Sequence, residues 1–193
     1  MIRRFVSRRL RRTIIGIGAA VCVFMGPLLS TAADPPGALE EYEVKAAFLC
    51  NFLSFVEWPQ SAVSADSSNT ITIVGPEPSD IVLSNLSQRK FQGQAIVLRR
   101  CLNSAEVLPC RILFVHIDAL KRWPQIQATI ENSPILTVCD LNGPMPRGMV
   151  IGLTLRDNRV SITVNVDEAQ RRGFRLSSRL LKLAEVAHDT AIR

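Results

Sequence analysis

The sequence predicts an α/β fold, a single-domain sandwich in which helices cover a mixed β-sheet, ending in a β-hairpin and a C-terminal helix. Short β-branched runs alternate with segments of helical periodicity along most of the chain, which is the order typical of a sheet interleaved with helices. Near the C-terminus, two runs of alternating apolar residues lie close together, which indicates a hairpin. A length of 193 residues suits one domain with a core of its own.

The first 33 residues have the three parts of a secretory signal peptide. A basic segment ends at Arg12, an apolar run of 17 residues follows, and small residues lead up to Ala33. This run is shorter than the ~20 residues of a membrane-spanning helix, so we expect cleavage, Sec export and no direct membrane insertion afterwards. Six of the 23 basic residues lie in this leader, which leaves 17 basic residues against 17 acidic ones. The basic charge therefore gives no support for nucleic-acid binding.

The mature chain is predicted to begin with a short linker and a long helix. Residues 34–40 contain Pro-Pro-Gly, which favours neither helix nor strand. Residues 41–58 carry apolar side chains at helical spacing in two neighbouring stripes, which indicates a helix packed on more than one side. Pro59 disfavours helical geometry at the residue before it, so the helix should end at Trp58.

The middle of the chain is predicted to supply most of the sheet. Residues 70–75 form a short β-branched run, which predicts a strand, and Ser79 or Asp80 then caps a helix that extends to about Leu86. Further strands are predicted at residues 94–100, 111–117 and 134–140, with a helix at 119–132 and a loop at 142–148.

The last third of the chain has the clearest local pattern. Apolar residues alternate on both sides of Asp157-Asn158, which predicts a hairpin, although this pair is a weaker turn signal than Asn-Gly. Beyond the hairpin we expect a short turn that ends at Gly173, capped by Asn165 or Asp167, and a helix from Ser177 through Ala187.

No pattern of catalytic or metal-binding residues is visible in the sequence. The two histidines, His116 and His188, are far apart, and neither lies in a metal-ligand spacing or in a motif that places it beside a nucleophile. His116 is expected to be structural or solvated. The arginine-rich segment 168–179 has few aromatic residues beside it and is expected to be a solvated helix face. The sequence therefore predicts a protein that is not an enzyme and that holds no metal or cofactor.

Four cysteines remain after the leader, and an even number in an exported chain is compatible with disulfides. Cys101 and Cys110 bracket a ten-residue segment between two predicted strands, and we hypothesise a bond between them. A bond that closes so small a loop stabilises a fold by about 2.5–3 kcal/mol. Cys50 and Cys139 lie in apolar segments, where they are either small buried hydrophobes or partners in a second disulfide.

The segment "VKAAFLCNFLSFVEWP" resembles the entry motif of the YfiR family of periplasmic proteins, which usually has Tyr where this chain has Cys50. Other landmarks follow in order: "ITIVGPEP" resembles the first strand and its turn, and "CRILFVH" a strand headed by a family cysteine. "ILTVCD" is similar to a segment that often has Ser in place of Cys139, and "NRVSITVNVDEAQRRGFRLSSRLLKLAEV" resembles the closing strand and helix. The resemblance covers about residues 41–187.

The resemblance implies a periplasmic repressor. Members of this family restrain an inner-membrane diguanylate cyclase by contacting its periplasmic sensor domain, and release of that contact raises cyclic di-GMP and favours biofilm. The resemblance also implies a homodimer and disulfides that maintain the active repressor. Two alternatives stay open: a periplasmic redox or small-ligand sensor with a different partner, and an enzyme of a kind not visible in the sequence.

Overall fold

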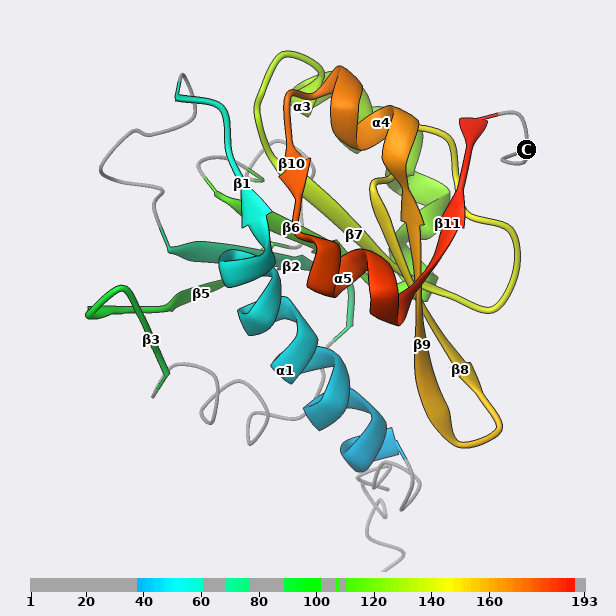
Figure 1. The fold of residues 1–193 in the computed structure, drawn as a ribbon. Helices are drawn as coiled ribbons and strands as arrows, with labels where there is room; N and C mark the ends of the chain where they lie inside the picture. The colour runs from blue at the N-terminus through cyan, green and yellow to red at the C-terminus, as the bar shows by residue number, and fades with distance from the viewer. Residues whose placement is uncertain (1–37, 61–68, 77–88, 102–106, 108–109, 190–193) are drawn as a thin grey trace, which may run out of the picture. The chain divides into compact units, whose positions relative to one another are not determined.

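A seven-stranded mixed sheet forms the middle layer of the fold (Figure 1). The computed structural model describes residues 38–60, 69–76, 89–101, 107 and 110–189. In spatial order the strands are β11 (Ala184–Ala187), β9 (Arg159–Asn165), β8 (Ile151–Arg156), β7 (Leu136–Leu141), β6 (Ile112–Val115), β2 (Thr70–Val74) and β5 (Val97–Cys101). Neighbours from β5 to β8 are parallel, β9 is antiparallel to β8, and β11 is parallel to β9. The predicted α/β fold with a mixed sheet is confirmed.

The central strands are continuous apolar runs because both of their faces are covered. Every residue of β2, β6 and β7 is buried, whereas most residues of the edge strand β5 are partly or fully exposed. Parallel strands between two helical layers have this pattern, since neither face meets water. The strands predicted from apolar runs at 70–75, 111–117 and 134–140 are therefore all present, with slightly shorter bounds.

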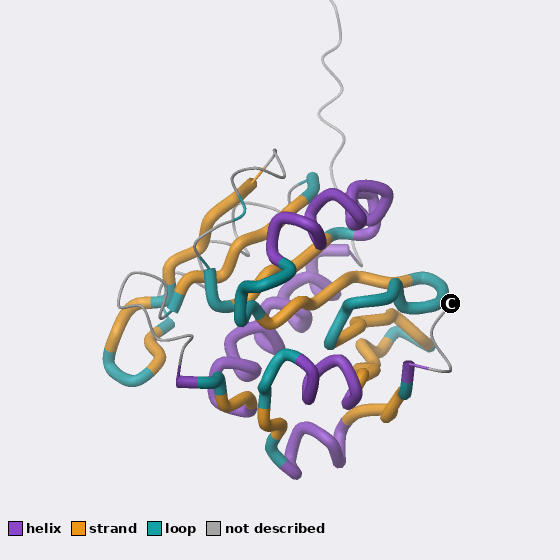
Figure 2. Tube along the Cα trace, turned by 90° about the horizontal axis from the view of Figure 1, so that it is seen from above, coloured by secondary structure: helices purple, strands orange, loops and turns teal. Residues whose placement is uncertain are grey.

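Helices cover the two faces of the sheet (Figure 2). One apolar cluster packs α1 (Ala38–Phe55), α4 (Val166–Arg171) and α5 (Ser178–Leu183) against one face. A second apolar cluster packs the 3₁₀ helix η4 (Ile117–Arg122) and α3 (Trp123–Ile130) against the other face. Each face thus has its own core, and residues that alternate along a strand enter different cores.

The first helix differs from its prediction at both ends. It begins at Ala38, inside the segment predicted to be a linker, and it ends at Phe55 and not at Trp58. Val56–Glu57 form β1, which pairs antiparallel with β10 (Arg175–Leu176). The Ser177 amide then donates to the Phe55 carbonyl at 2.8 Å. The helix stops early because its last residues find strand partners that are remote in sequence.

Two other predicted elements are each divided into two parts. The strand predicted at 94–100 is split into β5 and the short β4 (Gln94–Ala95), which forms a small hairpin with β3 (Lys90–Phe91). The helix predicted at 119–132 starts as η4 and continues as α3, with Pro124 in the first turn of α3. Proline is tolerated there because the first amides of a helix have no partner within the helix. The helix predicted after Ser79 or Asp80 lies outside the described residues.

The hairpin is confirmed, and the end of the chain is partly different. Asp157 and Asn158 have φ values of 48° and 60°, as a two-residue type I′ turn requires. The Asn165 side chain caps α4 by accepting from the Glu168 amide at 3.0 Å. The prediction that the last helix runs through Ala187 is wrong: α5 stops at Leu183, and Ala184–Ala187 form β11 along the free edge of β9. Pairing with that edge satisfies backbone groups that would otherwise stay open.

Candidate functional site

A group of polar side chains is buried where α1 crosses the carboxyl ends of β6 and β7. We call it the Lys45 cluster; it comprises Glu41, Tyr42, Lys45, His116 and Asp140. The Lys45 side chain is 2% exposed, and its Nζ lies 2.6 Å from Asp140 Oδ1 and also pairs with Glu41, one turn earlier in α1. A buried ammonium group is stable only when it is paired. The Asp140 carboxylate therefore holds the start of α1 to the sheet, whereas the pair with Glu41 lies within the helix.

His116 has partners on both ring nitrogens within the same cluster. Its Nε2 contacts the Tyr42 hydroxyl, and its Nδ1 accepts from the Asp118 amide at 3.2 Å. The prediction that His116 is structural is therefore supported, since the side chain is buried and caps η4. Gly75, just after β2, lies against it: a Cβ on Gly75 would be 2.4 Å from the Cβ of His116.

The Lys45 cluster lies at the edge of the sheet where many other α/β folds bind ligands. Ligands of open α/β sheets bind outside the carboxyl ends of the strands, where successive connections leave in opposite directions. Here β5 lies on one side of β2 and β6 lies on the other, so this edge has that topology. However, Lys45 and Asp140 are buried and paired with each other, so their charges are already compensated within the fold. We therefore assign the cluster the role of positioning α1.

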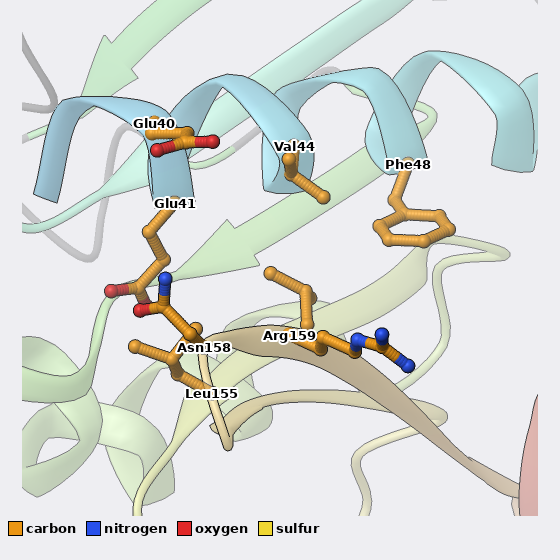
Figure 3. Close-up of a pocket in the computed structure, with 8 residues that line it drawn as sticks. Glu40, Glu41, Val44, Phe48, Leu155, Asn158 and Arg159 are labelled. Carbon is orange, nitrogen blue, oxygen red and sulfur yellow. The ribbon is translucent and has the colours of Figure 1, made fainter. Parts of the chain in front are cut away.

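An open cleft of about 300 Å³ lies beside this cluster, between the start of α1 and the β8–β9 hairpin. Figure 3 shows Val44 and Phe48 directed from α1 toward the hairpin, with Leu155 and Arg159 on the opposite side. Val44 is 41% exposed and Leu155 is 42% exposed, which is high for large aliphatic side chains. Glu40 and Glu41 of α1 and Arg159 of the hairpin flank this apolar floor. Such a surface can bind another molecule without performing any chemistry.

Cys101 and Cys110, the predicted disulfide partners, are brought to the same side of the sheet. Cys101 ends β5 level with Val74, the last residue of β2, whereas Cys110 precedes β6 beside the start of β2. The two residues therefore lie on either side of β2 and near its opposite ends. Both belong to the core that α3 covers, and the structure has them as free thiols. Burial raises the pKa of Cys110 to about 11, against the opposing effects of Thr72 and Arg99. The bond between them stays a prediction.

Cys50 and Cys139 are placed on opposite faces of the sheet. Cys50 faces the core beneath α1, and Cys139 on β7 faces the core beneath α3. Burial raises the pKa of both thiols. A disulfide needs Cα atoms within about 7 Å and Cβ atoms that approach each other. The structure therefore supports the interpretation of these two cysteines as small buried hydrophobes and argues against a bond between them.

The last residues that the structure describes, His188 and Asp189, are held to α4 by hydrogen bonds and ion pairs. His188 Nδ1 lies 3.0 Å from Asp167 Oδ1, and the Asp189 amide donates to the other oxygen of Asp167 at 3.0 Å. The Asp189 amide and His188 together lower the pKa of Asp167. Asn165 Nδ2 donates to Asp189 Oδ1 at 2.9 Å. These contacts give His188 a structural role in keeping β11 on the sheet.

The arginine-rich segment is only partly the solvated face that the sequence predicts. Arg172 is buried against Glu168, with its Nε 2.5 Å from Glu168 Oε1, and Arg171 pairs with the same carboxylate. The solvated interpretation is wrong for Arg172, because a carboxylate that is itself buried in α4 draws this guanidinium inward. Within the described ranges, no three His, Cys, Asp or Glu side chains are placed to hold a metal ion.

One residue of the Lys45 cluster can be recognised from the sequence. Lys45 is a single cation within the apolar stretch of the first helix, and a charge in such a place requires a buried counter-charge. Only the fold shows that Asp140 supplies this counter-charge, because the two residues are 95 positions apart.

No helix among the described residues is long and apolar enough to cross a membrane.

The fold and its surface define the class first: an α/β sandwich with a paired polar cluster at the strand ends and an open cleft beside it. The sequence then identifies the family. The model of the YfiR/HmsC-like family matches residues 42–185, and the chain belongs to that family. A comparison with curated proteins found no match.

Proposed function

We propose that this protein is a periplasmic regulatory binding protein that represses an inner-membrane diguanylate cyclase through the cyclase's periplasmic sensor domain, and so lowers cyclic di-GMP signalling. The observation that carries the proposal is membership of the YfiR/HmsC-like family over residues 42–185, which includes every strand of the main sheet except the last two residues of β11. A repressor of this kind acts by contact and needs no catalytic group.

The cleft between α1 and the β8–β9 hairpin is the surface that we propose for this contact. Its exposed Val44 and Leu155 offer an apolar centre, and the charges of Glu40, Glu41 and Arg159 surround it. Protein interfaces combine an apolar core with a polar rim in this way. The Lys45 cluster supports the surface from behind, because it holds α1 at a fixed place on the sheet.

Export, dimerisation and redox control complete the proposal. The leader at residues 1–33 directs the chain to the periplasm, where disulfides are formed and kept. The mature protein forms a homodimer, in line with its family. Cys101 and Cys110 form a disulfide by exchange with the disulfide of an external oxidant. The two thiols lose two electrons and two protons, and the oxidant's disulfide takes them up and becomes two thiols. Both thiols lie in one core on the same side of the sheet, and the bond requires Cys101 and Cys110 to approach each other along β2.

The experiment is a pull-down from host membranes with the mature protein as bait, followed by mass spectrometry, with and without reductant. We expect recovery of a membrane protein with a GGDEF domain, and loss of that recovery on reduction. A Val44→Glu bait should recover at least tenfold less, because the added carboxylate must be desolvated in the apolar centre. Val97→Glu is the matched control, since Val97 is 49% exposed on β5 and lies outside the cleft.

The outcomes separate the parts of the proposal. Failure of wild-type bait to recover any cyclase from membranes that contain one would refute the repressor function. Equal recovery by the Val44→Glu and Val97→Glu baits would refute the cleft as the contact surface. Recovery that does not respond to reductant would refute the redox link. Sedimentation of the mature protein at micromolar concentration tests the homodimer separately.

A further inference from the structure

A second hollow, of about 550 Å³, lies where the end of α1 meets the turn of the β3–β4 hairpin. Leu53, Val56 and Phe91 give it apolar walls, and Trp58 and Arg111 line it as well. This pocket shares no residue with the cleft between α1 and the β8–β9 hairpin. It combines aromatic surface with a cation, Arg111, that has no carboxylate partner among the described residues.

Arg111 is the feature that requires an explanation. Its side chain is half-buried just before β6, and burial lowers its pKa. The guanidinium carbon lies 4.9 Å from the centre of the Trp58 ring, but no carboxylate of the described residues lies within ion-pair distance. Glu57 lines the same pocket and is exposed, yet it makes no ion pair with Arg111. Desolvating a cation without an anionic partner costs free energy that the rest of the fold must offset.

Trp58, which lines the same pocket, has a buried indole N–H without a partner among the described residues. Its ring packs edge-on against Phe174, with 6.0 Å between centroids, and lies under Arg111 on another side. Its Nε1 is buried and has no acceptor among the described residues. The other tryptophan, Trp123, donates from Nε1 to the Arg147 carbonyl at 2.8 Å. An unmade hydrogen bond of a buried donor costs about 1–3 kcal/mol, so the surroundings of Trp58 are less well satisfied than those of Trp123.

We propose that this pocket binds a small organic carboxylate with an apolar body, whose carboxylate pairs with Arg111 and whose body packs against Trp58 and Phe91. The Arg111 guanidinium lies over the Trp58 ring and has no carboxylate partner among the described residues, and its planar fork of N–H groups matches the two oxygens of a carboxylate. The apolar walls supply the surface that the body of the ligand buries. The inference does not depend on the proposed repressor function, because it concerns ligand binding alone.

The test uses the ¹⁵N-labelled mature protein, which has two indole N–H signals, one from Trp58 and one from Trp123. Phenylacetate is the probe, and phenylacetamide is its neutral match. We expect phenylacetate to shift the Trp58 signal in a saturable manner and to leave the Trp123 signal in place. Phenylacetamide should bind at least about tenfold more weakly, which corresponds to about 1.4 kcal/mol for the lost charge-assisted contact.

Variants of Arg111 test whether its guanidinium supplies the affinity for phenylacetate. Arg111→Gln should weaken phenylacetate binding about tenfold or more, and Arg111→Lys should retain part of the affinity because it keeps the charge but loses the planar fork. Arg156→Gln is the control, since Arg156 is exposed on the β8–β9 hairpin and does not line the pocket. The comparison of phenylacetate with phenylacetamide uses wild-type protein only, so it decides the question even if Arg111→Gln does not fold.

Three results would overturn the proposal. The first is a Trp58 signal that does not move at millimolar phenylacetate. The second is equal affinity for the acid and the amide. The third is saturable binding of phenyl phosphate or inorganic phosphate without binding of phenylacetate, which would show that the pocket takes a phosphate and not a carboxylate.

Discussion

Replacing Lys45 by Met tests the idea that one buried cation holds α1 on the sheet. The Lys45 and Asp140 side chains are 2% and 7% exposed, with 2.6 Å between Nζ and Oδ1. At that distance, an effective dielectric constant of about 20 gives a gross attraction of about 6 kcal/mol. Most of this attraction offsets the desolvation of the two charges. Removing only the cation leaves the Asp140 carboxylate buried without a partner, which typically costs about 3–5 kcal/mol.

We therefore expect Lys45→Met to lower the free energy of unfolding by about 3–5 kcal/mol and Tm by roughly 6–20 °C, measured by urea and thermal denaturation. The double variant Lys45→Met/Asp140→Leu should recover most of this loss, because it removes both charges. Lys121→Met is the matched control, since Lys121 is exposed on η4.

A loss below 1 kcal/mol at pH 8, or a double variant no more stable than the single one, would refute the reasoning.

Three further predictions follow from the geometry. Gly75→Ala should lower the free energy of unfolding by at least about 2 kcal/mol, because φ is +136° and the new methyl meets His116, whereas Gly143→Ala, with open space around it, should have little effect in the same denaturation assay. Asn158→Gly should raise Tm, with about 0.5 kcal/mol of stabilisation, because the residue has φ 60°; a lower Tm would contradict the turn assignment. In reduced protein at pH 8, iodoacetamide should label Cys110 roughly 100-fold more slowly than in urea, because its pKa rises from 9.0 to about 11. This thiol's contribution to stability should disappear as pH rises from about 9 to 11, and equal labelling rates in the two states would exclude the burial.

The sheet could be predicted from sequence where local pattern alone decides it. The strands at 70–75, 111–117 and 134–140 are mostly apolar because both of their faces are covered. The β8–β9 hairpin can be predicted because its two strands are neighbours in sequence and apolar residues alternate along them. The ends of helices were harder to predict. α1 stops at Phe55 because its continuation pairs with β10, more than a hundred positions later along the chain, and no local signal marks that partner.

The binding surfaces were beyond sequence reasoning for a similar reason. The cleft brings Val44 on α1 next to Leu155 on the hairpin, and each of these residues alone is typical of an ordinary core position. Arg111 heads an apolar strand and gives no sign that it lacks a carboxylate. Only the assembled fold shows which groups are satisfied and which are open.

The pairing of Lys45 with Asp140 also has a kinetic consequence. A chain that is synthesised or exported from its N-terminus presents α1 first, but the carboxylate that neutralises Lys45 emerges 95 residues later. Contacts this far apart in sequence form slowly, because a long loop must close before they contribute. Until β7 emerges, Lys45 lacks its partner on the sheet, and the apolar stripes of α1 are only partly covered and are prone to association with other chains. Newly arrived chains should therefore depend on a holding chaperone during this interval, and the rate of refolding should be limited by the docking of α1.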